Sequence, residues 1–485
     1  MASCRLVIKD EVNVKFEGLD LSMRKHLTNK FKYEIPYARY LPAYKLGRWD
    51  GTVSFFGLGG TTYVSMLEEV LVELDNKGVY VEVEDLRQKV DLNFSKVDTD
   101  YLSDTVWPVG HTHAGQPIKL RDYQVEVINN FLANPQSLQE VATGAGKTII
   151  TATLSKICEQ YGDTIVIVPN KSLVTQTEED YKNVGLDVGV YFGDRKELGH
   201  KHTIVTWQSL NILDKKSKNA EAVTTLQEFI QDVRCIIVDE VHQAKADVLK
   251  RLLTQNFAHV PIRWGLTGTI PKEQFEFQGI KAGLGEVINQ ISASDLQAKG
   301  VLADCHVNII QTEDVQEHKT YQEELKFLTT DETRMKWIAE LITKLTENGN
   351  TLVLVDRLSA GNLLQSNIKD SVFISGETKS DTRKEHYDEV KTSMDKVIIA
   401  TYGVAAVGIN IPRIFNLVLI EPGKSFVRVI QSIGRGIRKA EDKDHVQIWD
   451  ITSRCKFAKR HLTQRKKFYR EANYPFTIER IAIDK

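Results

Sequence analysis

The stretch 142–148 reads ATGAGKT, and the stretch 239–242 further along the chain reads DEVH. In the first stretch, Gly144 and Gly146 let the backbone curl tightly and present its N–H groups to phosphate oxygens. A helix expected to begin at Lys147 adds its positive N-terminal dipole. The first stretch therefore predicts a loop that binds the phosphates of a nucleotide.

The side chains of both stretches suit a magnesium-bound nucleoside triphosphate. Lys147 can reach the β and γ phosphates as a point charge, and Thr148 can ligate Mg²⁺. Asp239 follows an apolar strand, where a parallel sheet places its functional carboxyl ends, and is the second expected magnesium ligand. Glu240 is the candidate that orients or activates the attacking water. The predicted cofactors are therefore ATP and Mg²⁺, and the loop residues expected around the phosphates are Thr143, Gly144, Ala145 and Gly146.

Strands and helices alternate from about residue 120 onward. Continuous apolar runs, which indicate strands buried on both faces of a parallel sheet, occur in two sets. The first set includes 164–168 and 235–238, and the second comprises 307–310, 351–355, 372–375, 397–400 and 417–420. We predict an α/β protein with two tandem doubly wound parallel-sheet lobes.

The N-terminal residues follow a different pattern. Short alternating runs and one helical repeat before residue 110 predict a small α+β domain. The stretch 107–117 is rich in glycine and proline and predicts a linker. The expected domains are therefore 1–110, which we expect to bind nucleic acid, 111–298 as the ATP-binding lobe, and 299–485 as the second lobe.

Bulk properties exclude several classes of protein. The net charge of -2 excludes a global polycation, so a nucleic-acid-binding protein of this composition needs local basic patches. The five cysteines form no C-x-x-C pair, which argues against a structural zinc site or a disulfide framework. The N-terminus has no signal-peptide pattern, and no apolar run reaches membrane-spanning length. We expect a cytoplasmic protein without a membrane partner.

The motif series as a whole resembles the superfamily 2 helicases of the DExH type. The matching segments follow in the family's order: 121–124, 168–174, 206–210, 239–242, 265–269, 354–357, 401–403 with 408–412, and 431–438. The resemblance implies two RecA-like lobes. It assigns the reading of adenine to Gln124, and the coupling of hydrolysis to movement to His242, Thr267 and Thr269.

The last of these segments implies an arginine finger. Arg435 and Arg438 are three residues apart and share one face if they lie on a helix. Their guanidinium groups could reach the γ phosphate from the second lobe, a contribution worth roughly 10³–10⁵ in rate in well-studied cases. Gln431, in the same segment, joins the predicted catalytic residues. Solvated surface arginines are the alternative.

Four further segments resemble the UvsW-type helicases of bacteriophages: 48–51, 320–324, 336–341 and 375–377. This resemblance implies an ATP-dependent DNA helicase that unwinds and branch-migrates forked or junction DNA. Fork regression and Holliday-junction processing, in replication, recombination and repair, are the implied roles. It also implies a phage source, the host cytoplasm as the location, and branched or single-stranded DNA as the partner of a monomer.

Nucleic-acid contacts are expected from motif positions and from one basic, aromatic cluster. The motif positions are Asn170, Lys171, Thr206, Gln208, Thr401 and Tyr402. The cluster is Lys45, Arg48 and Trp49, which could touch phosphates and stack on a base; the alternative is a core tryptophan beside solvated charges. The basic stretch 454–470 could lie along DNA or form a solvated face.

Three other functions remain open. An RNA helicase would use the same two lobes, because contacts to the sugar–phosphate backbone dominate in both cases. A restriction-type translocase subunit would need a nuclease cluster of carboxylates and lysine, and the sequence contains no convincing one. A non-catalytic nucleic-acid scaffold would not need intact residues at Lys147, Asp239, Glu240, Arg435 and Arg438.

Overall fold

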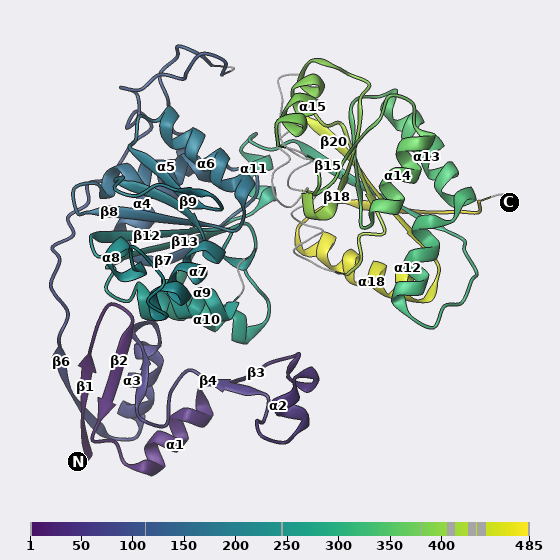
Figure 1. The fold of residues 1–485 in the computed structure, drawn as a ribbon. Coiled ribbons are helices and arrows are strands. Elements are labelled where there is room, and N and C mark those ends of the chain that lie inside the picture. Colours follow the sequence, from purple (N-terminus) through teal and green to yellow (C-terminus); the bar gives the residue numbers. More distant parts are fainter. Residues whose placement is uncertain are drawn as a thin grey trace. The chain divides into compact units, whose positions relative to one another are not determined.

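The structure is a computed structural model (Figure 1), and it describes residues 2–111, 113–243, 246–378, 380–404, 413–424, 433 and 443–483. The chain divides into two compact units. The first comprises residues 1–141 with 146–290, and the second comprises 142–145 with 291–485. Within the described residues, none of the helices combines the length and the apolar character that crossing a membrane requires.

A small mixed domain begins the first unit, as predicted. Its sheet has the order β5-β2-β1-β6, in which β1 and β2 are antiparallel and β1 and β6 are parallel. The elements are β1 (Ala2–Ile8), β2 (Asn13–Glu17), α1 (Leu21–Lys30), β5 (Thr61–Tyr63), α3 (Leu67–Asn76) and β6 (Val79–Asp85). Alternate residues of β2 face the core, where Phe16 and Phe56 lie fully buried between the sheet and the two helices.

This domain packs on the lobe that follows it. The Glu11 N–H donates to the Ala258 carbonyl at 3.0 Å, and the Asn13 amide donates to the Thr254 carbonyl at 2.8 Å. The connecting chain also reaches the lobe before the expected boundary, since the Asn93 N–H donates to the Tyr161 hydroxyl at 2.9 Å. The boundaries at residues 110 and 298 remain predictions.

The first lobe contains an eight-stranded sheet with the order β10-β9-β11-β8-β12-β13-β7-β14. Every pair from β9 to β7 is parallel, which confirms the doubly wound prediction. The strands are β7 (Gln136–Val141), β8 (Asp163–Val168), β9 (Val188–Phe192), β10 (Arg195–Lys196), β11 (His202–Thr206), β12 (Val233–Asp239), β13 (Ile262–Thr267) and β14 (Glu286–Ile291). The helices are α4 (Asp122–Ala133), α5 (Lys147–Cys158), α6 (Lys171–Asn183), α7 (Trp207–Lys218), α8 (Leu226–Ile230), α9 (Ala246–Arg251) and α10 (Gln274–Leu284), with single turns at η3 (Val241–Gln243) and η4 (Leu252–Asn256).

The second lobe contains a seven-stranded sheet with the order β17-β18-β16-β19-β20-β15-β21, in which all pairs are parallel. The strands are β15 (Asp304–Thr312), β16 (Thr351–Val355), β17 (Val372–Ile374), β18 (Val397–Thr401), β19 (Asn416–Ile420), β20 (His445–Ser453) and β21 (Phe476–Ile481). The helices are α11 (Ala293–Ala298), α12 (Tyr321–Thr330), α13 (Glu332–Thr346), α14 (Leu358–Asn367), α15 (Ser380–Thr392) and α18 (Lys456–Glu471). Every strand predicted in this region is present.

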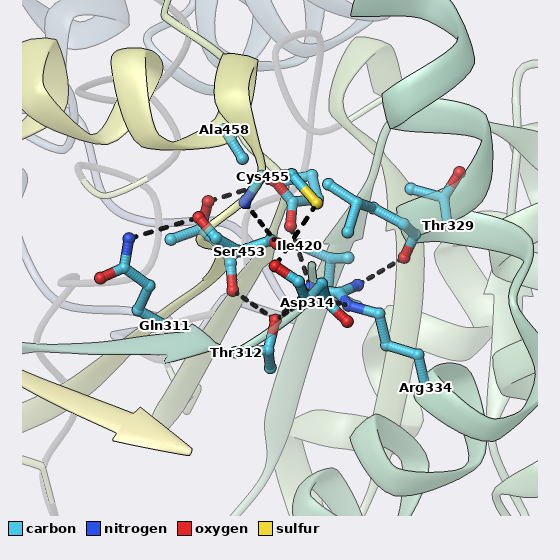
Figure 2. A network of polar contacts seen from close by, with 12 residues as sticks. Gln311, Thr312, Asp314, Thr329, Arg334, Ile420, Ser453, Cys455 and Ala458 are labelled. Atoms are coloured by element: carbon cyan, nitrogen blue, oxygen red, sulfur yellow. Dashed lines mark hydrogen bonds and ion pairs between the residues drawn. The ribbon is translucent and has the colours of Figure 1, made fainter. Parts of the chain in front are cut away.

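A buried polar network lies where β15, β19 and β20 end (Figure 2). The Thr312 hydroxyl bonds to Asp314 at 2.5 Å, and the Arg334 guanidinium contacts Asp314 at 3.5 Å and Glu421 at 2.9 Å. Burial raises the pKa of the Glu421 carboxyl to about 7, although the positive charge of Arg334 opposes this rise. The network ties helix α13 to the carboxyl edge of the sheet.

Helix α18 carries the basic stretch, and one of its charges is structural. Arg465 is fully buried, and two of its nitrogens donate to the Asp450 carboxylate at 2.8 and 2.9 Å. The Tyr469 hydroxyl donates to the same carboxylate at 2.6 Å. Neither alternative for 454–470, a helix along DNA or a solvated face, therefore applies to the Arg465 side chain, because its sequence context does not reveal its buried partner.

Candidate nucleotide site and nucleic-acid interface

The predicted phosphate loop joins β7 to α5 directly. Gly144 and Gly146 have φ angles of +93° and +72°, a left-handed conformation that favours glycine. Gly146 is the N-cap of α5, so the helix begins at Lys147 with its first N–H groups at the loop. The structure thus forms the curled loop and helix N-terminus that phosphate binding requires.

Lys147 and Glu240 form a buried ion pair in this lobe. Lys147 Nζ lies 2.5 Å from Glu240 Oε1, and the two side chains are 9% and 5% exposed. The same ammonium donates to the Val141 carbonyl at 3.4 Å. A cation and a carboxylate that are this deeply buried stabilise each other, because either charge alone would be strongly destabilising in the protein interior. The structure therefore brings together two predicted catalytic residues, one at the start of α5 and one directly after β12.

Glu240 occupies a backbone conformation that is rare for its residue type. Its φ angle is +50°, which costs a non-glycine residue about 1–3 kcal/mol. Two further contacts hold it: its N–H donates to Asp239 Oδ1 at 2.9 Å, and its Oε2 accepts from the Gly268 N–H at 3.3 Å. The carboxylate is thus fixed between Lys147 of α5 and the end of β13.

The three predicted coupling residues are linked in one chain of hydrogen bonds. The Thr267 hydroxyl donates to the Thr269 carbonyl at 2.7 Å, and it lies 2.6 Å from His242 Nδ1. Because that hydroxyl has only one proton, His242 Nδ1 must be the donor to Thr267. His242 Nδ1 also lies 3.6 Å from Glu240 Oε2. A displacement of Glu240 would therefore change the contacts of the 267–269 turn.

Gln124 lies against the phosphate loop. A Cβ atom added to Gly146 would lie 2.8 Å from Gln124 Nε2. The side-chain Oε1 of Gln124 accepts from the Arg121 N–H at 2.9 Å, closing the capping box of α4. This contact orients the amide toward the loop, as the predicted adenine-reading residue requires; the role itself remains a prediction.

Asp180 is a candidate that the sequence did not reveal. Burial raises the pKa of its carboxyl to about 6, and the neighbouring Glu179 adds to the rise, whereas a hydrogen bond with Thr148 opposes it. Asp180 belongs to the run 178–180, which reads EED on α6 and looks like a solvated acidic face. Only the packing of α6 on α5 places this carboxyl beside the predicted magnesium ligand.

The site fits ATP with Mg²⁺ by its donor set. Lys147 and the backbone of the loop supply positive charge for phosphates, while the Thr148 hydroxyl and the Asp239 carboxylate supply the oxygen ligands that Mg²⁺ prefers. The part of the chain that the structure describes has no group of three or more His, Cys, Asp or Glu side chains that could hold a metal ion.

Two predicted nucleic-acid motifs lie side by side at the carboxyl edge of the first lobe. Strands β8 and β11 are parallel neighbours, and their last residues, Val168 and Thr206, are paired in register. Asn170 is half-buried as the N-cap of α6, and Lys171 and Gln208 are exposed. The Gln208 amide donates to the Pro169 carbonyl at 3.3 Å and so links the two motifs.

Two predicted contacts are turned into the protein. Thr206 is 5% exposed, and its hydroxyl caps α7 through the Ser209 N–H at 3.3 Å. Tyr402 is also 5% exposed, and its hydroxyl donates to the Ile420 carbonyl at 3.3 Å, whereas Thr401 is half-buried at the end of β18. Any contact of Thr206 or Tyr402 with nucleic acid would have to come from the backbone.

The N-terminal cluster divides into exposed charges and a packed ring. Lys45 and Arg48 are exposed, whereas Trp49 is half-buried and its indole N–H donates to the Thr52 carbonyl at 2.7 Å. The predictions for Gln431, Arg435 and Arg438, and for residues 405–412 of the same motif series, lie outside the described residues.

Comparisons with known proteins agree with this geometry. The family model "Type III restriction enzyme, res subunit" matches residues 117–272, and "Helicase conserved C-terminal domain" matches residues 333–440. The ATP-dependent DNA helicase uvsW of Enterobacteria phage T4 is 25% identical over 465 residues, covering 91% of this chain and 89% of that protein. A putative DNA 3'-5' helicase Rad25 of Halobacterium salinarum is 27% identical, covering 66% of this chain and 52% of that protein.

The fold is also found in a solved structure. The fragment structure of a putative HsdR subunit of a type I restriction enzyme from Vibrio vulnificus matches with a TM-score of 0.57 and 17% identity, covering 97% of this chain and 85% of that one. The two parallel-sheet lobes, the phosphate loop and the DEVH segment define an ATP-dependent helicase. The chain belongs to the superfamily 2 helicases.

Proposed function

We propose that this enzyme, an ATP-dependent DNA helicase, unwinds and branch-migrates forked or junction DNA. The observation that carries the proposal is the extent of the similarity to the phage T4 helicase. The match covers 91% of the chain, and the unmatched 9% is shorter than residues 1–110. The similarity therefore extends beyond the two lobes into the N-terminal domain, where a second grip on DNA would lie. The proposed setting is replication-fork regression and Holliday-junction processing in the cytoplasm of a phage host.

ATP hydrolysis supplies the energy in this proposal. The loop backbone and Lys147 bind the phosphates, Thr148 and Asp239 hold Mg²⁺, and Glu240 accepts a proton from the attacking water at its Oε2 or Oε1. The metal ion contributes charge neutralisation when it is bound. When a triphosphate binds, Lys147 would pair with its phosphates instead of with Glu240. The Glu240 carboxylate would then be free to act as a base. Arg435, Arg438 and Gln431 complete the proposed catalytic set.

The hydrogen-bond chain supports a route from hydrolysis to movement. Glu240 contacts both the Gly268 N–H and the ring of His242, and His242 donates to Thr267. A change in the position of the carboxylate on hydrolysis would shift the 267–269 turn. Contacts of Asn170, Lys171 and Gln208 with the sugar–phosphate backbone would convert such shifts into stepping along one DNA strand.

ATP turnover with different nucleic acids tests the proposal. We expect forked DNA to stimulate turnover of the full chain more than a tailed DNA duplex, and both to exceed duplex RNA. Lys147→Ala should abolish turnover but keep fork binding, whereas Lys182→Ala, on the surface of the same lobe, should keep both. Stronger stimulation by duplex RNA would identify an RNA helicase, and no stimulation by any nucleic acid would indicate a scaffold.

A restriction-type translocase is the second candidate, because one family model and the HsdR fragment both come from restriction enzymes. Such a subunit would move along unbranched duplex DNA without a preference for branch points. Displacement of a triplex-forming strand from plain duplex, compared with conversion of a fork of the same sequence, separates the two functions. Equal or faster triplex displacement would favour the translocase.

A further inference from the structure

The hairpin of β3 (Lys32–Glu34) and β4 (Thr52–Ser54) carries an unusual loop, residues 35–51, which we call the hairpin cap. In Figure 1 the hairpin follows α1, with the small helix α2 (Pro42–Lys45) at its tip. A 3₁₀ turn, η1 (Ala38–Tyr40), precedes α2. Between Glu34 and Asp50 the sequence has three tyrosines, one tryptophan and three cationic residues, and no acidic residue.

The hairpin cap is ordered by its own contacts. The Ile35 N–H donates to the Gly51 carbonyl at 2.9 Å, and the Arg48 N–H donates to the Ala43 carbonyl at 2.9 Å. Gly51 has a φ of +79°, and a Cβ atom there would lie 3.0 Å from the Tyr44 ring. The indole of Trp49 closes the loop through Thr52. These contacts fix the cap as a preformed surface.

The outer face of the hairpin cap leaves large rings and aliphatic side chains in water. Tyr40 is 63% exposed, Tyr44 is 42% exposed and Leu46 is 64% exposed. A rigid surface with several exposed apolar groups close together marks an interaction site, because soluble proteins seldom leave such groups uncovered. The exposure is not needed for folding, since the same domain buries its own core around Phe16 and Phe56.

The charges of the hairpin cap indicate the chemistry of its partner. The Arg39 guanidinium lies 4.9 Å from the centroid of the Tyr40 ring, and Lys45 and Arg48 of the same loop are also exposed. Aromatic rings interleaved with cations match unpaired nucleotides, whose bases stack on the rings while their phosphates contact the cations. An apolar protein partner would not require three cations, and Asp50, the one acidic residue of the cap, is paired with Lys32 of β3.

The hairpin cap is also attached to the motor lobe of the same compact unit. The Tyr37 ring meets the Phe275 ring of α10 edge-on, with centroids 6.1 Å apart. A nucleotide bound on the cap would therefore be held in a fixed position relative to the first lobe, rather than on a tether.

We propose that the hairpin cap is a stacking platform for unpaired bases at a DNA branch point. Tyr40 and Tyr44 stack on the bases, while Arg39, Lys45 and Arg48 contact the adjoining phosphates. Trp49, expected from the sequence to stack, is instead a positioning residue that closes the loop. This inference rests on the proposed function and specifies which part of a branched substrate the N-terminal domain recognises.

Binding of the full chain to three labelled DNAs tests the platform: a fork with unpaired arms, a four-way junction, and a blunt duplex. Loss of one stacked base lowers affinity roughly 5- to 150-fold. We therefore expect Tyr40→Ala/Tyr44→Ala to weaken fork binding at least tenfold and to leave blunt-duplex binding and unstimulated ATP turnover unchanged. Tyr40→Phe/Tyr44→Phe should bind like the wild type, because stacking needs the ring and not the hydroxyl.

A matched control and an optical probe make the test specific. Tyr80→Ala removes a 66% exposed tyrosine from β6 of the same domain and should change nothing. With 2-aminopurine at the branch point, the fluorescence change that stacking causes should occur with the wild type and disappear with Tyr40→Ala/Tyr44→Ala. Arg39→Gln/Lys45→Gln/Arg48→Gln should reduce the slope of log affinity against log salt by roughly 2–3.

Two results would overturn the platform. Equal loss on the fork and the blunt duplex would mean a general electrostatic surface, and an unchanged fork affinity would assign the hairpin cap to a protein partner instead. Both presuppose that the wild-type chain binds the fork. If the wild type itself shows no preference for branched over blunt DNA, the proposed function fails first, and that failure is visible before any variant is compared.

Discussion

Removing the ammonium of Lys147 should destabilise the first lobe through the charge it leaves behind. Lys147→Met keeps the length of the side chain but leaves the Glu240 carboxylate 5% exposed without its cation. Breaking a buried pair in this way costs about 3–5 kcal/mol. Glu240 Oε2 keeps the Gly268 N–H at 3.3 Å, so we expect the lower part of that range.

A double variant separates the energetic cost of an unpaired buried charge from the cost of lost packing. Glu240→Gln removes the carboxylate, so Lys147→Met/Glu240→Gln should recover most of the loss. The coupling energy of the cycle should be about 2 kcal/mol or more, because the two groups are in contact. A matched control is Lys182→Met, whose ammonium is 58% exposed and whose partner Glu178 keeps Arg195. That change should cost about 0–1 kcal/mol.

Hydrogen exchange of the amides in α5 measures these energies locally. The method reports the free energy of opening of that helix, independently of the other domains of the chain. Equal costs for Lys147→Met and for the double variant would contradict this prediction, because they would show that Lys147→Met leaves no destabilising unpaired charge. So would a Lys147→Met cost no larger than that of Lys182→Met.

Three further outcomes follow from contacts elsewhere. Burial lowers the pKa of the His202 imidazole, so the unfolded chain takes up a proton near pH 6.5, before the folded chain does. Urea unfolding should therefore show that the free energy of unfolding falls as the pH drops below about 6.5. The His202→Gln variant should have a flatter pH profile. Arg465→Met leaves the fully buried Asp450 carboxylate with the Tyr469 hydroxyl but without its cation, and should cost about 3–5 kcal/mol in urea unfolding, much of which Asp450→Asn should restore. Gly146→Ala strains a φ of +72° and brings a Cβ atom 2.8 Å from Gln124 Nε2, so calorimetry should show at least tenfold weaker ATP binding and an unchanged fork affinity.

Sequence patterns were sufficient for the parallel lobes because their strands are buried on both faces. Runs such as 235–238 contain only apolar residues and admit few other structures. The phosphate loop could be predicted equally well, since its glycines and Lys147 lie next to each other in the sequence. The pairing of Lys147 with Glu240 was not, because it depends on how β12 and α5 meet in space.

The features that the sequence did not reveal have one physical origin. Arg465 was expected only as one charge of a basic stretch and Asp180 was not singled out, and tertiary packing places each beside a specific partner. Thr206 and Tyr402 match helicase motifs by position, yet their side chains face inward. Periodicity and motif order give the face on which an element is buried, whereas the partner of a single polar side chain depends on contacts between distant segments.

The most direct test of the account is ATP-dependent conversion of a synthetic four-way junction into two duplexes by the full chain. A replication fork and a plain tailed duplex of the same sequence are compared alongside it. The proposed function predicts rapid conversion of the junction and the fork, slower unwinding of the tailed duplex, and no conversion with Lys147→Ala or without Mg²⁺. Unwinding of the tailed duplex with both branched substrates left intact would contradict it.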